Sequence, residues 1–205
     1  MRIFLTLALI IFLSHTSVLA QIVVGKYHLS STGKDYVVLV DDMQNRYKGK
    51  TINKQLKKCQ IYLQVESSSN DIAAFIEMTS GDIKGFIKNL DNHFSKAQRY
   101  SNGMRCFRVL VGDGDVNLFM KYHNDATGND IYGYESGQDY NIYYERNEEG
   151  QVFITYYGEQ AKSEGKDGLA INGWQLILSS EEEIQVIDEL LQKAQAMIKS
   201  NSAEL

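Results

Sequence analysis

The chain has 205 residues, of which 26 are acidic and 21 are basic, and its formal net charge is −5 with neutral histidines. This balance repels phosphate backbones, and no face rich in lysine and arginine is large enough to overcome it, so we expect no nucleic acid partner. The length suits one domain that buries its core without metal or disulfide staples.

The first twenty residues have the three-part pattern of a secretory signal peptide. Arg2 precedes an apolar run over residues 3–13, and Val18 and Ala20 are the small residues that signal peptidase requires. We expect cleavage after Ala20 and export of a soluble protein to the periplasm or the extracellular space. The alternative is an uncleaved membrane anchor, but eleven helical residues cover about 16 Å, roughly half of a hydrocarbon core of about 30 Å. We expect no stable membrane insertion after cleavage.

Alternating apolar residues, many of them β-branched or aromatic, predict four strands in the first half of the chain. They cover residues 22–28, 35–41, 58–66 and 71–79. Thr79 and Asp82 then match a capping box, which predicts the start of a helix. Apolar residues spaced by three and four continue this helix to about Tyr100.

The second half is predicted to begin with a hairpin, because residues 112–115 (Gly-Asp-Gly-Asp) separate two apolar-rich segments. Its strands cover 104–111 and 116–122, a polar loop follows over 123–139, and strands return at 140–146, 151–157 and 169–178. Ser180 and Glu183 belong to a second capping box, which predicts a last helix to about Lys199.

These elements predict an α+β fold in which antiparallel strands are covered by two amphipathic helices. We expect a signal peptide over 1–20 and a single domain over 21–205. The halves 21–102 and 103–200 resemble each other, since Thr79 and Ile83 match Ser180 and Ile184 at a constant offset. This similarity favours a duplicated arrangement of strands followed by a helix, although any two strand–cap–helix units look alike.

The chain has two cysteines, Cys59 and Cys106. In an oxidising compartment such a pair favours a disulfide, which would stabilise the fold by about 4 kcal/mol. Both cysteines lie in predicted strands, so two buried free thiols are the alternative. The sequence does not decide between them.

Catalytic and metal-binding motifs do not emerge from the sequence. The histidines of the exported part do not approach the spacing of a zinc site; they are His28, His93 and His123. A calcium loop that began at Asp113 would need glycine at its sixth position, where Leu118 stands. We therefore predict no cofactor, no metal site and no catalytic residue.

Tyrosine is the unusual residue, because seven of the thirteen lie between residues 132 and 157. We expect an exposed face beside Asn, Gln and Asp side chains, and its candidate ligand-binding residues are Tyr132, Tyr134, Tyr140, Tyr143 and Tyr144. Tyrosine offers a flat apolar ring with a polar tip, which suits stacking on sugars or binding to a protein. The alternative is that these tyrosines are strand formers divided between core and solvent.

The function that these observations favour is an exported, non-enzymatic binding domain whose partner is a protein or a glycan. One alternative is an exported hydrolase whose site is assembled from residues distant in the sequence. Another is an inhibitor or assembly factor whose exposed strand edge pairs with a client. The sequence does not indicate the oligomeric state.

Overall fold

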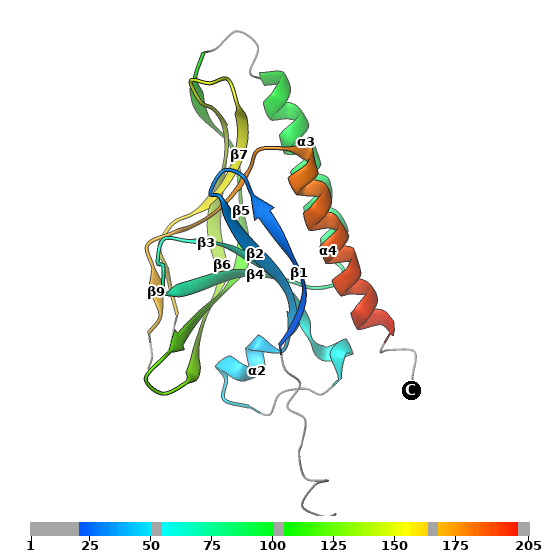
Figure 1. Ribbon diagram of the computed structural model, residues 1–205, viewed down its shortest axis with the longest axis vertical. Coiled ribbons are helices and arrows are strands. Elements are labelled where there is room, and N and C mark those ends of the chain that lie inside the picture. Colours follow the sequence, from blue (N-terminus) through cyan, green and yellow to red (C-terminus); the bar gives the residue numbers. More distant parts are fainter. Residues whose placement is uncertain (1–20, 51–54, 101–104, 164–167, 201–205) are drawn as a thin grey trace, which may run out of the picture.

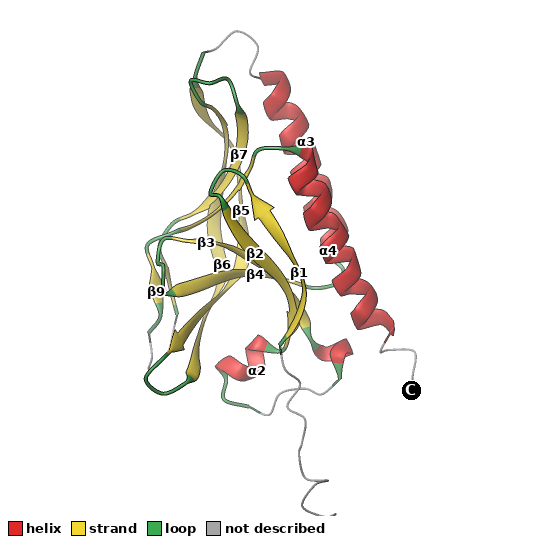
Figure 2. Ribbon diagram, viewed as in Figure 1, coloured by secondary structure: helices red, strands yellow, loops and turns green. Residues whose placement is uncertain are grey.

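The computed structural model describes residues 21–50, 55–100, 105–163 and 168–200, and this part of the chain is mostly sheet (Figures 1 and 2). The signal peptide predicted over residues 1–20, with its cleavage point after Ala20, lies outside the described residues. Among the helices described, none is long and apolar enough to cross a membrane.

The described strands form one antiparallel sheet of eight strands and a small sheet of two. The large sheet contains β1 (Ile22–Leu29), β2 (Lys34–Asp41), β3 (Gln60–Ser67), β4 (Ile72–Met78), β5 (Phe107–Asn124), β6 (Asn129–Arg146), β7 (Val152–Gly158) and β10 (Trp174–Leu178). The small sheet contains β8 (Ala161–Lys162) and β9 (Ala170–Ile171). Six strands, in the order β3-β4-β5-β6-β7-β10, close into a barrel because β10 pairs again with β3, and β2 and β1 extend the sheet beyond β3.

Strand β3 allows this closure because one of its edges serves two neighbours. Its first half pairs with β2, whereas Glu66 and Ser67 at its end pair with Gln175 and Trp174 of β10. Its other edge pairs with β4. The predicted α+β fold with two helices is therefore wrong, since the described chain is a six-stranded antiparallel barrel with extra strands and three α-helices. The sequence shows where strands lie but not that the end of β3 meets β10.

The arrangement of strands followed by a helix, repeated twice, belongs to the predicted fold class that the structure corrects, and the two halves differ in their strands. Strands of both halves belong to one closed sheet, because β4 pairs with β5 and β3 pairs with β10. The second half contains two strands of 18 residues, β5 and β6, whereas those of the first half have 7 or 8.

Two long helices begin at the two capping boxes in the sequence. Helix α3 (Ile83–Tyr100) follows Asp82, whose carboxylate accepts hydrogen bonds from the Thr79 N–H at 2.9 Å and the Thr79 hydroxyl at 2.6 Å. Helix α4 (Glu181–Ser200) follows Ser180, whose hydroxyl accepts from the Glu183 N–H at 3.2 Å. Satisfying these otherwise unpaired groups fixes where each helix begins.

A third, short helix, α2 (Met43–Tyr47), was not predicted. Asp42 caps it, because its side chain accepts from the Asn45 N–H at 3.4 Å and from the Asn45 amide at 2.7 Å. Five residues are too few to show a helical repeat of apolar positions, so the sequence pattern gave no sign of this helix.

The inner face of the barrel forms the main core together with α3 and α4. Alternate residues such as Leu63 of β3 and Leu118 of β5 point to this face and are 0% exposed. Helices α3 and α4 lie side by side against the sheet and add apolar stripes that include Leu90 and Ile187 (Figure 1). On β6, β7 and β10 this core is mainly aromatic, and its rings there are those of Tyr140, Tyr144, Tyr156 and Trp174.

A second, smaller apolar cluster lies on the opposite face of the same strands, where α2 packs. We call it the outer cluster; its buried members are Leu39, Met43, Tyr62, Phe75 and Phe119, and Val37, Tyr47, Ala73, Tyr132 and Tyr134 pack against them. Because successive strand residues point to opposite faces, Phe119 joins the outer cluster while Leu118 and Met120 join the core.

The hairpin predicted at residues 112–115 and the loop predicted over 123–139 are wrong. Strands β5 and β6 pair from Phe107 and Arg146 to Asn124 and Asn129, and the chain turns between them, with Gly128 at a φ of 67°. Glycine at 114 serves another purpose, because a Cβ there would lie 2.5 Å from the Tyr140 hydroxyl oxygen. The Asp-Gly pattern therefore marks a close approach between strands and not a turn.

Candidate functional site

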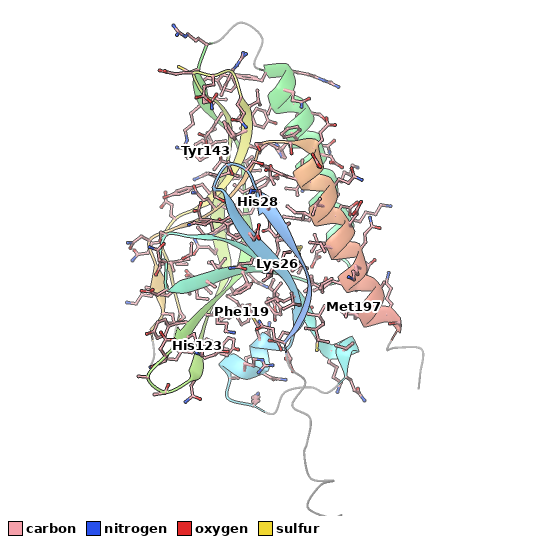
Figure 3. The ribbon with its side chains drawn as sticks, viewed as in Figure 1. Lys26, His28, Phe119, His123, Tyr143 and Met197 are labelled. Carbon is pink, nitrogen blue, oxygen red and sulfur yellow. The ribbon has the colours of Figure 1, made fainter. Side chains whose placement is uncertain are left out.

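The tyrosines expected to form one exposed face are divided between two faces of β6. Tyr132 and Tyr134 pack against the outer cluster, whereas Tyr140 and Tyr144 belong to the inner core. Tyr143 points away from that core, and the Arg108 guanidinium lies 4.3 Å above its ring centre (Figure 3). The structure therefore does not bring the five residues together on a single face, because neighbouring strand residues alternate in direction.

Tyr132 and Tyr134 are structural as well as partly accessible. The Tyr134 ring lies 4.6 Å from that of Phe119 and 6.0 Å from that of Tyr47. The Tyr132 hydroxyl donates to Asp130 Oδ2 at 3.3 Å. Burial, together with the nearby Asp130 carboxylate, raises the pKa of Tyr132 to about 12, so its hydroxyl stays a neutral donor.

Both cysteines are free thiols in the structure, with Cys59 buried and Cys106 exposed. The Cys59 thiol donates to the Gln55 carbonyl oxygen at 3.8 Å. Burial and the carboxylates of Asp42 and Asp41 raise the pKa of this thiol to about 11. A thiol that stays protonated is a poor nucleophile, so Cys59 is a core residue.

Two hairpins end in the same short sequence pattern, which the sequence reasoning missed. Residues 28–35 read HLSSTGKD and residues 123–130 read HNDATGND, so both follow His-x-x-x-Thr-Gly-x-Asp. In both turns the glycine has positive φ, 66° at Gly33 and 67° at Gly128. The Gly33 N–H donates to the Leu29 carbonyl at 2.9 Å, and the Gly128 N–H donates to the Asn124 carbonyl at 2.8 Å. A search for repeats shorter than a whole half of the chain would have found this signal.

The histidine and aspartate of each pattern meet across the base of their turn. His28 Nδ1 lies 2.8 Å from Asp35 Oδ1, and His123 Nδ1 lies 2.8 Å from Asp130 Oδ1. Figure 3 shows His28 and His123 at the ends of different hairpins, apart from each other. The sequence placed these histidines in no site because each partner is seven residues away, on the neighbouring strand.

The second pair has an additional cation. Lys121 Nζ lies 2.9 Å from Asp130 Oδ2, so Asp130 contacts both a lysine and a histidine. Burial alone would raise the pKa of Asp130, but hydrogen bonds from Lys121 and His123 outweigh it and hold this pKa below its usual value. The carboxylate therefore stays ionised and fixes both basic side chains.

A groove of about 520 Å³ extends between these two hairpins, across the connection from β3 to β4. The β1–β2 hairpin contributes Lys34, Asp35 and Tyr36 to its wall, and β5 contributes Lys121 and His123. A second depression of about 490 Å³ adjoins it, and the residues that line both are Lys34, Glu66, Ser67 and Asn70. We call the two together the polar groove.

Hydrogen-bonding side chains line most of the polar groove, and an apolar floor lies beneath them. The second depression adds Tyr157, Asn172 and Gln175. The Glu66 carboxylate accepts from Lys34 Nζ at 3.3 Å and from Gln175 Nε2 at 2.6 Å, which holds it in place. The floor contains Ile72, Ala73 and the buried Phe75, and Phe75 is also a member of the outer cluster.

The charges around the polar groove are largely paired within the protein. Lys34 pairs with Glu66 and Lys121 pairs with Asp130, while Asp35 contacts His28. Asp71 also lines the groove and forms no ion pair with a described residue, so the pairing neutralises the lysines and fixes donors and acceptors at the wall. The arrangement suits a neutral ligand with many hydroxyl groups.

His123 and Asp130 have the geometry of a base and the group that orients it. Among the described residues, however, no hydroxyl or thiol hydrogen-bonds to His123, and its Nε2 has Asp125 Oδ1 at 3.8 Å. The described part of the chain also brings together no group of three or more His, Cys, Asp or Glu side chains that could hold a metal ion.

No family model, no curated protein and no solved structure matches this chain.

Proposed function

We propose that this chain is an exported, non-enzymatic binding domain that holds a hydroxyl-rich ligand, such as an oligosaccharide, in the polar groove. The observation that supports this most is the composition of the groove wall, where amide, carboxylate and hydroxyl side chains surround an apolar floor. The other support is the pairing of Lys34 with Glu66 and of Lys121 with Asp130, which leaves neither lysine of the groove free to attract an anion.

Sugar hydroxyl groups both donate and accept hydrogen bonds, so they need both kinds of partner in a binding site. Asn70 and Asn172 each supply an amide donor and an amide acceptor at the groove, and Gln64 adds an amide donor, because its Oε1 already accepts from the Val37 N–H at 3.1 Å. Tyr157 adds a half-buried ring, whose flat apolar surface suits the C–H face of a sugar. Two depressions that share part of their lining offer room for a chain of sugars more than for a single one.

The proposal is tested with the protein from residue 21 to 205 on an oligosaccharide array, followed by calorimetry on the glycans that bind. Asn70→Ala with Asn172→Ala removes two amides at the groove, and Asn89→Ala with Asn92→Ala removes two exposed amides from α3 as a matched control. We expect the groove variant to bind about tenfold more weakly, since two hydrogen bonds contribute about 0.5–1.5 kcal/mol each, and the control to bind as wild type. Absence of binding to any glycan, or equal loss in both variants, would reject the groove as a glycan site.

Export depends on the predicted leader and has its own test. Intact mass spectrometry of protein from its native host should give a chain that begins at Gln21. A mass that includes the initiator methionine would contradict export by cleavage and leave the groove proposal to the binding data.

A hydrolase is the second candidate, because His123 lies at the groove wall and Asp130 orients it. If His123 activates water against a bound glycan, the wild type should release reducing ends and His123→Asn should not, while both bind the substrate. Binding without any release of reducing ends by the wild type would reject the hydrolase and leave the binding domain.

A further inference from the structure

The large sheet leaves one part of β5 without a second neighbour. The last pair between β4 and β5 is Glu77 with Asn117, so residues 107–116 pair with β6 on one side and with no described strand on the other. We call residues 107–116 the free edge. An unpaired strand edge presents N–H and C=O groups that can pair with another chain. The free edge shares no residue with the polar groove.

Two other edges of the same sheet are covered by side chains. On β1, Lys193 Nζ of α4 donates to the Val24 carbonyl at 3.2 Å. On β10, which pairs with β3 only through its first two residues, the Ile177 carbonyl accepts from the Ser31 hydroxyl at 3.0 Å. Outside the β5–β6 ladder, no hydrogen bond between described residues uses the backbone of the free edge. Its backbone groups are therefore available to a partner.

The free edge also has exposed apolar side chains. The described part of the chain has three large hydrophobic residues that are exposed, and two of them lie here. Leu110 is 56% exposed near the centre of the free edge, and Tyr100 of α3 is 48% exposed, with its ring 5.5 Å from that of Phe107 at one end. Apolar groups beside unpaired backbone favour contact with another polypeptide.

The charges on the free edge are complementary under a twofold rotation. Arg108 and Asp113 point to the same outer face, because their ladder partners Glu145 and Asn141 lie four residues apart on β6. Asp113 forms no ion pair with a described residue. In an antiparallel pairing with its axis just after Leu110, Arg108 of each copy stands opposite Asp113 of the other.

We propose that the free edge is a homodimer interface, in which β5 of one copy pairs with β5 of a second copy and joins the two sheets. The occupant is a second copy because the edge carries both members of an ion pair at equal distances from its centre. The bulge of β5 between Leu110 and Gly112 lies at the axis, so the regular strand on either side of it pairs. Association ends at the dimer, since dimerisation uses the free edge of both copies and α4 covers the edge of β1.

Sedimentation velocity of residues 21–205 over about a hundredfold range of micromolar concentrations tests the proposal. Leu110→Lys brings two positive charges together at the axis. Val23→Lys on β1 is the matched control, because Val23 is also 56% exposed. We expect wild type to dimerise with a Kd on the order of 10 μM, Leu110→Lys to weaken the dimer by at least about tenfold, and Val23→Lys to leave it within about twofold of wild type.

Exchange of the two charges gives a more specific test. Arg108→Asp and Asp113→Arg each place like charges opposite each other in the dimer and should weaken it by at least about tenfold. The variant with both substitutions restores an opposite pair and should recover most of the loss. Thermal melting of each variant reports on the monomer, because Arg108 also contacts Glu145 and the ring of Tyr143.

Four results would overturn the proposal. They are a wild type that stays monomeric over the whole range, association that continues beyond the dimer, equal weakening by Leu110→Lys and Val23→Lys, and a doubly exchanged variant that associates no more tightly than either single one. Glycan binding is measured separately and involves other residues, so each of these results leaves the polar groove to its own test.

Discussion

The two faces of the barrel sheet are buried by different kinds of side chain. The inner face is covered by α3 and α4 and is mainly aliphatic over β3 and β5, whereas the outer cluster is mainly aromatic and is covered by the five residues of α2. The outer cluster also includes a buried hydrogen bond, in which the Tyr62 hydroxyl donates to the Glu77 carboxylate at 3.2 Å. Phe75 joins the outer cluster to the floor of the polar groove, while Tyr36, Val65 and Trp174 of the inner core also line the groove, so both faces support the candidate site.

The largest expected loss of unfolding free energy concerns two neighbouring residues of β5, one on each face, that are both 0% exposed. Leu118→Ala opens a cavity in the inner core and should cost about 2–5 kcal/mol of unfolding free energy, and Phe119→Ala should cost about 3–5 kcal/mol in the outer cluster. Urea unfolding of the purified variants measures both.

Double-mutant cycles with Met43 of α2 test whether the outer cluster is a packing unit separate from the inner core. Met43→Ala should couple with Phe119→Ala, because both side chains belong to the outer cluster, and should be additive with Leu118→Ala. Coupling of Met43 with Leu118 instead, or a Phe119→Ala cost below about 1 kcal/mol, would show that the outer cluster is not a separate packing unit.

The next effect concerns the tight packing of the inner face. Gly158 stands opposite Trp174, and a Cβ at position 158 would overlap the indole ring. Gly158→Ala should therefore cost about 1–3 kcal/mol by overpacking. Gly85→Ala on α3 is the control, because nothing lies within 4 Å of a Cβ there and alanine favours helix; it should be neutral or stabilising. A stable Gly158→Ala variant would mean that the indole can shift and that this part of the core is loosely packed.

The helices show what the sequence could predict. Thr79 with Asp82 and Ser180 with Glu183 are local signals, and the apolar stripes that follow them extend over several turns, so α3 and α4 begin where expected. Helix α2 has no stripe, and its cap Asp42 resembles any aspartate after a strand. Closure of the barrel depends on which strands meet, and no local pattern in β3 records its pairing with β10.

The candidate site was harder to predict because its residues come from β2, β3, β4, β5, β7 and β10 and from the connections between them. The tyrosines were conspicuous by number, yet alternation along β6 sends Tyr140 and Tyr144 inward and Tyr143 outward. The His-x-x-x-Thr-Gly-x-Asp pattern was in the sequence twice and was missed, because each copy is too short to stand out in a comparison of whole halves. The meeting of Asp35 and His123 at one groove needed the barrel itself.

Tyr134 is a half-exposed residue that packs against the outer cluster, so its removal should reduce the unfolding free energy less than removal of a fully buried residue. Tyr134→Ala removes ring contacts with Phe119 and Tyr47 and should cost about 1–2 kcal/mol, whereas a strictly ligand-binding tyrosine would cost nothing. Tyr134→Phe keeps the ring and should melt as wild type. If Tyr134→Ala also melts as wild type, the ring contributes nothing to the cluster and its role is on the surface.

Two tyrosines of the inner core differ in whether their hydroxyl has a hydrogen-bond partner. The Tyr144 hydroxyl lies 3.1 Å from His93 Nδ1, whereas the buried Tyr156 hydroxyl has no partner among the described residues. Tyr144→Phe should therefore cost about 0.5–1.5 kcal/mol, and Tyr156→Phe should be neutral or stabilising. Chemical denaturation of both variants decides this, and a loss at Tyr156 as large as that at Tyr144 would indicate a bound water or ligand at the Tyr156 hydroxyl.

The smallest expected effect concerns how the unfolding free energy changes with pH, which should have opposite signs for a buried group on each face. Burial and the neighbouring Lys96 lower the pKa of His93, which faces the rings of Tyr144 and Tyr156 on the inner side. The unfolded chain therefore takes up this proton first, so the stability due to a neutral His93 is present above about pH 6.5 and declines as the pH falls toward the folded pKa. His93→Gln should lose less stability than wild type between about pH 7 and pH 5.

Glu77 on the outer side should behave in the opposite way. Burial raises its pKa despite hydrogen bonds from Asn117, Gln44 and Tyr62, so the folded chain holds this proton more tightly than the unfolded chain. Its contribution is therefore most favourable below about pH 4.3 and is lost as the pH rises through the folded pKa. Glu77→Gln keeps an oxygen that can accept from these partners but carries no charge at any pH, so relative to wild type it should become more stable as the pH rises. Difference profiles of the same slope for His93→Gln and Glu77→Gln would mean that desolvation does not govern both groups, because burial must push the pKa of a base down and that of an acid up.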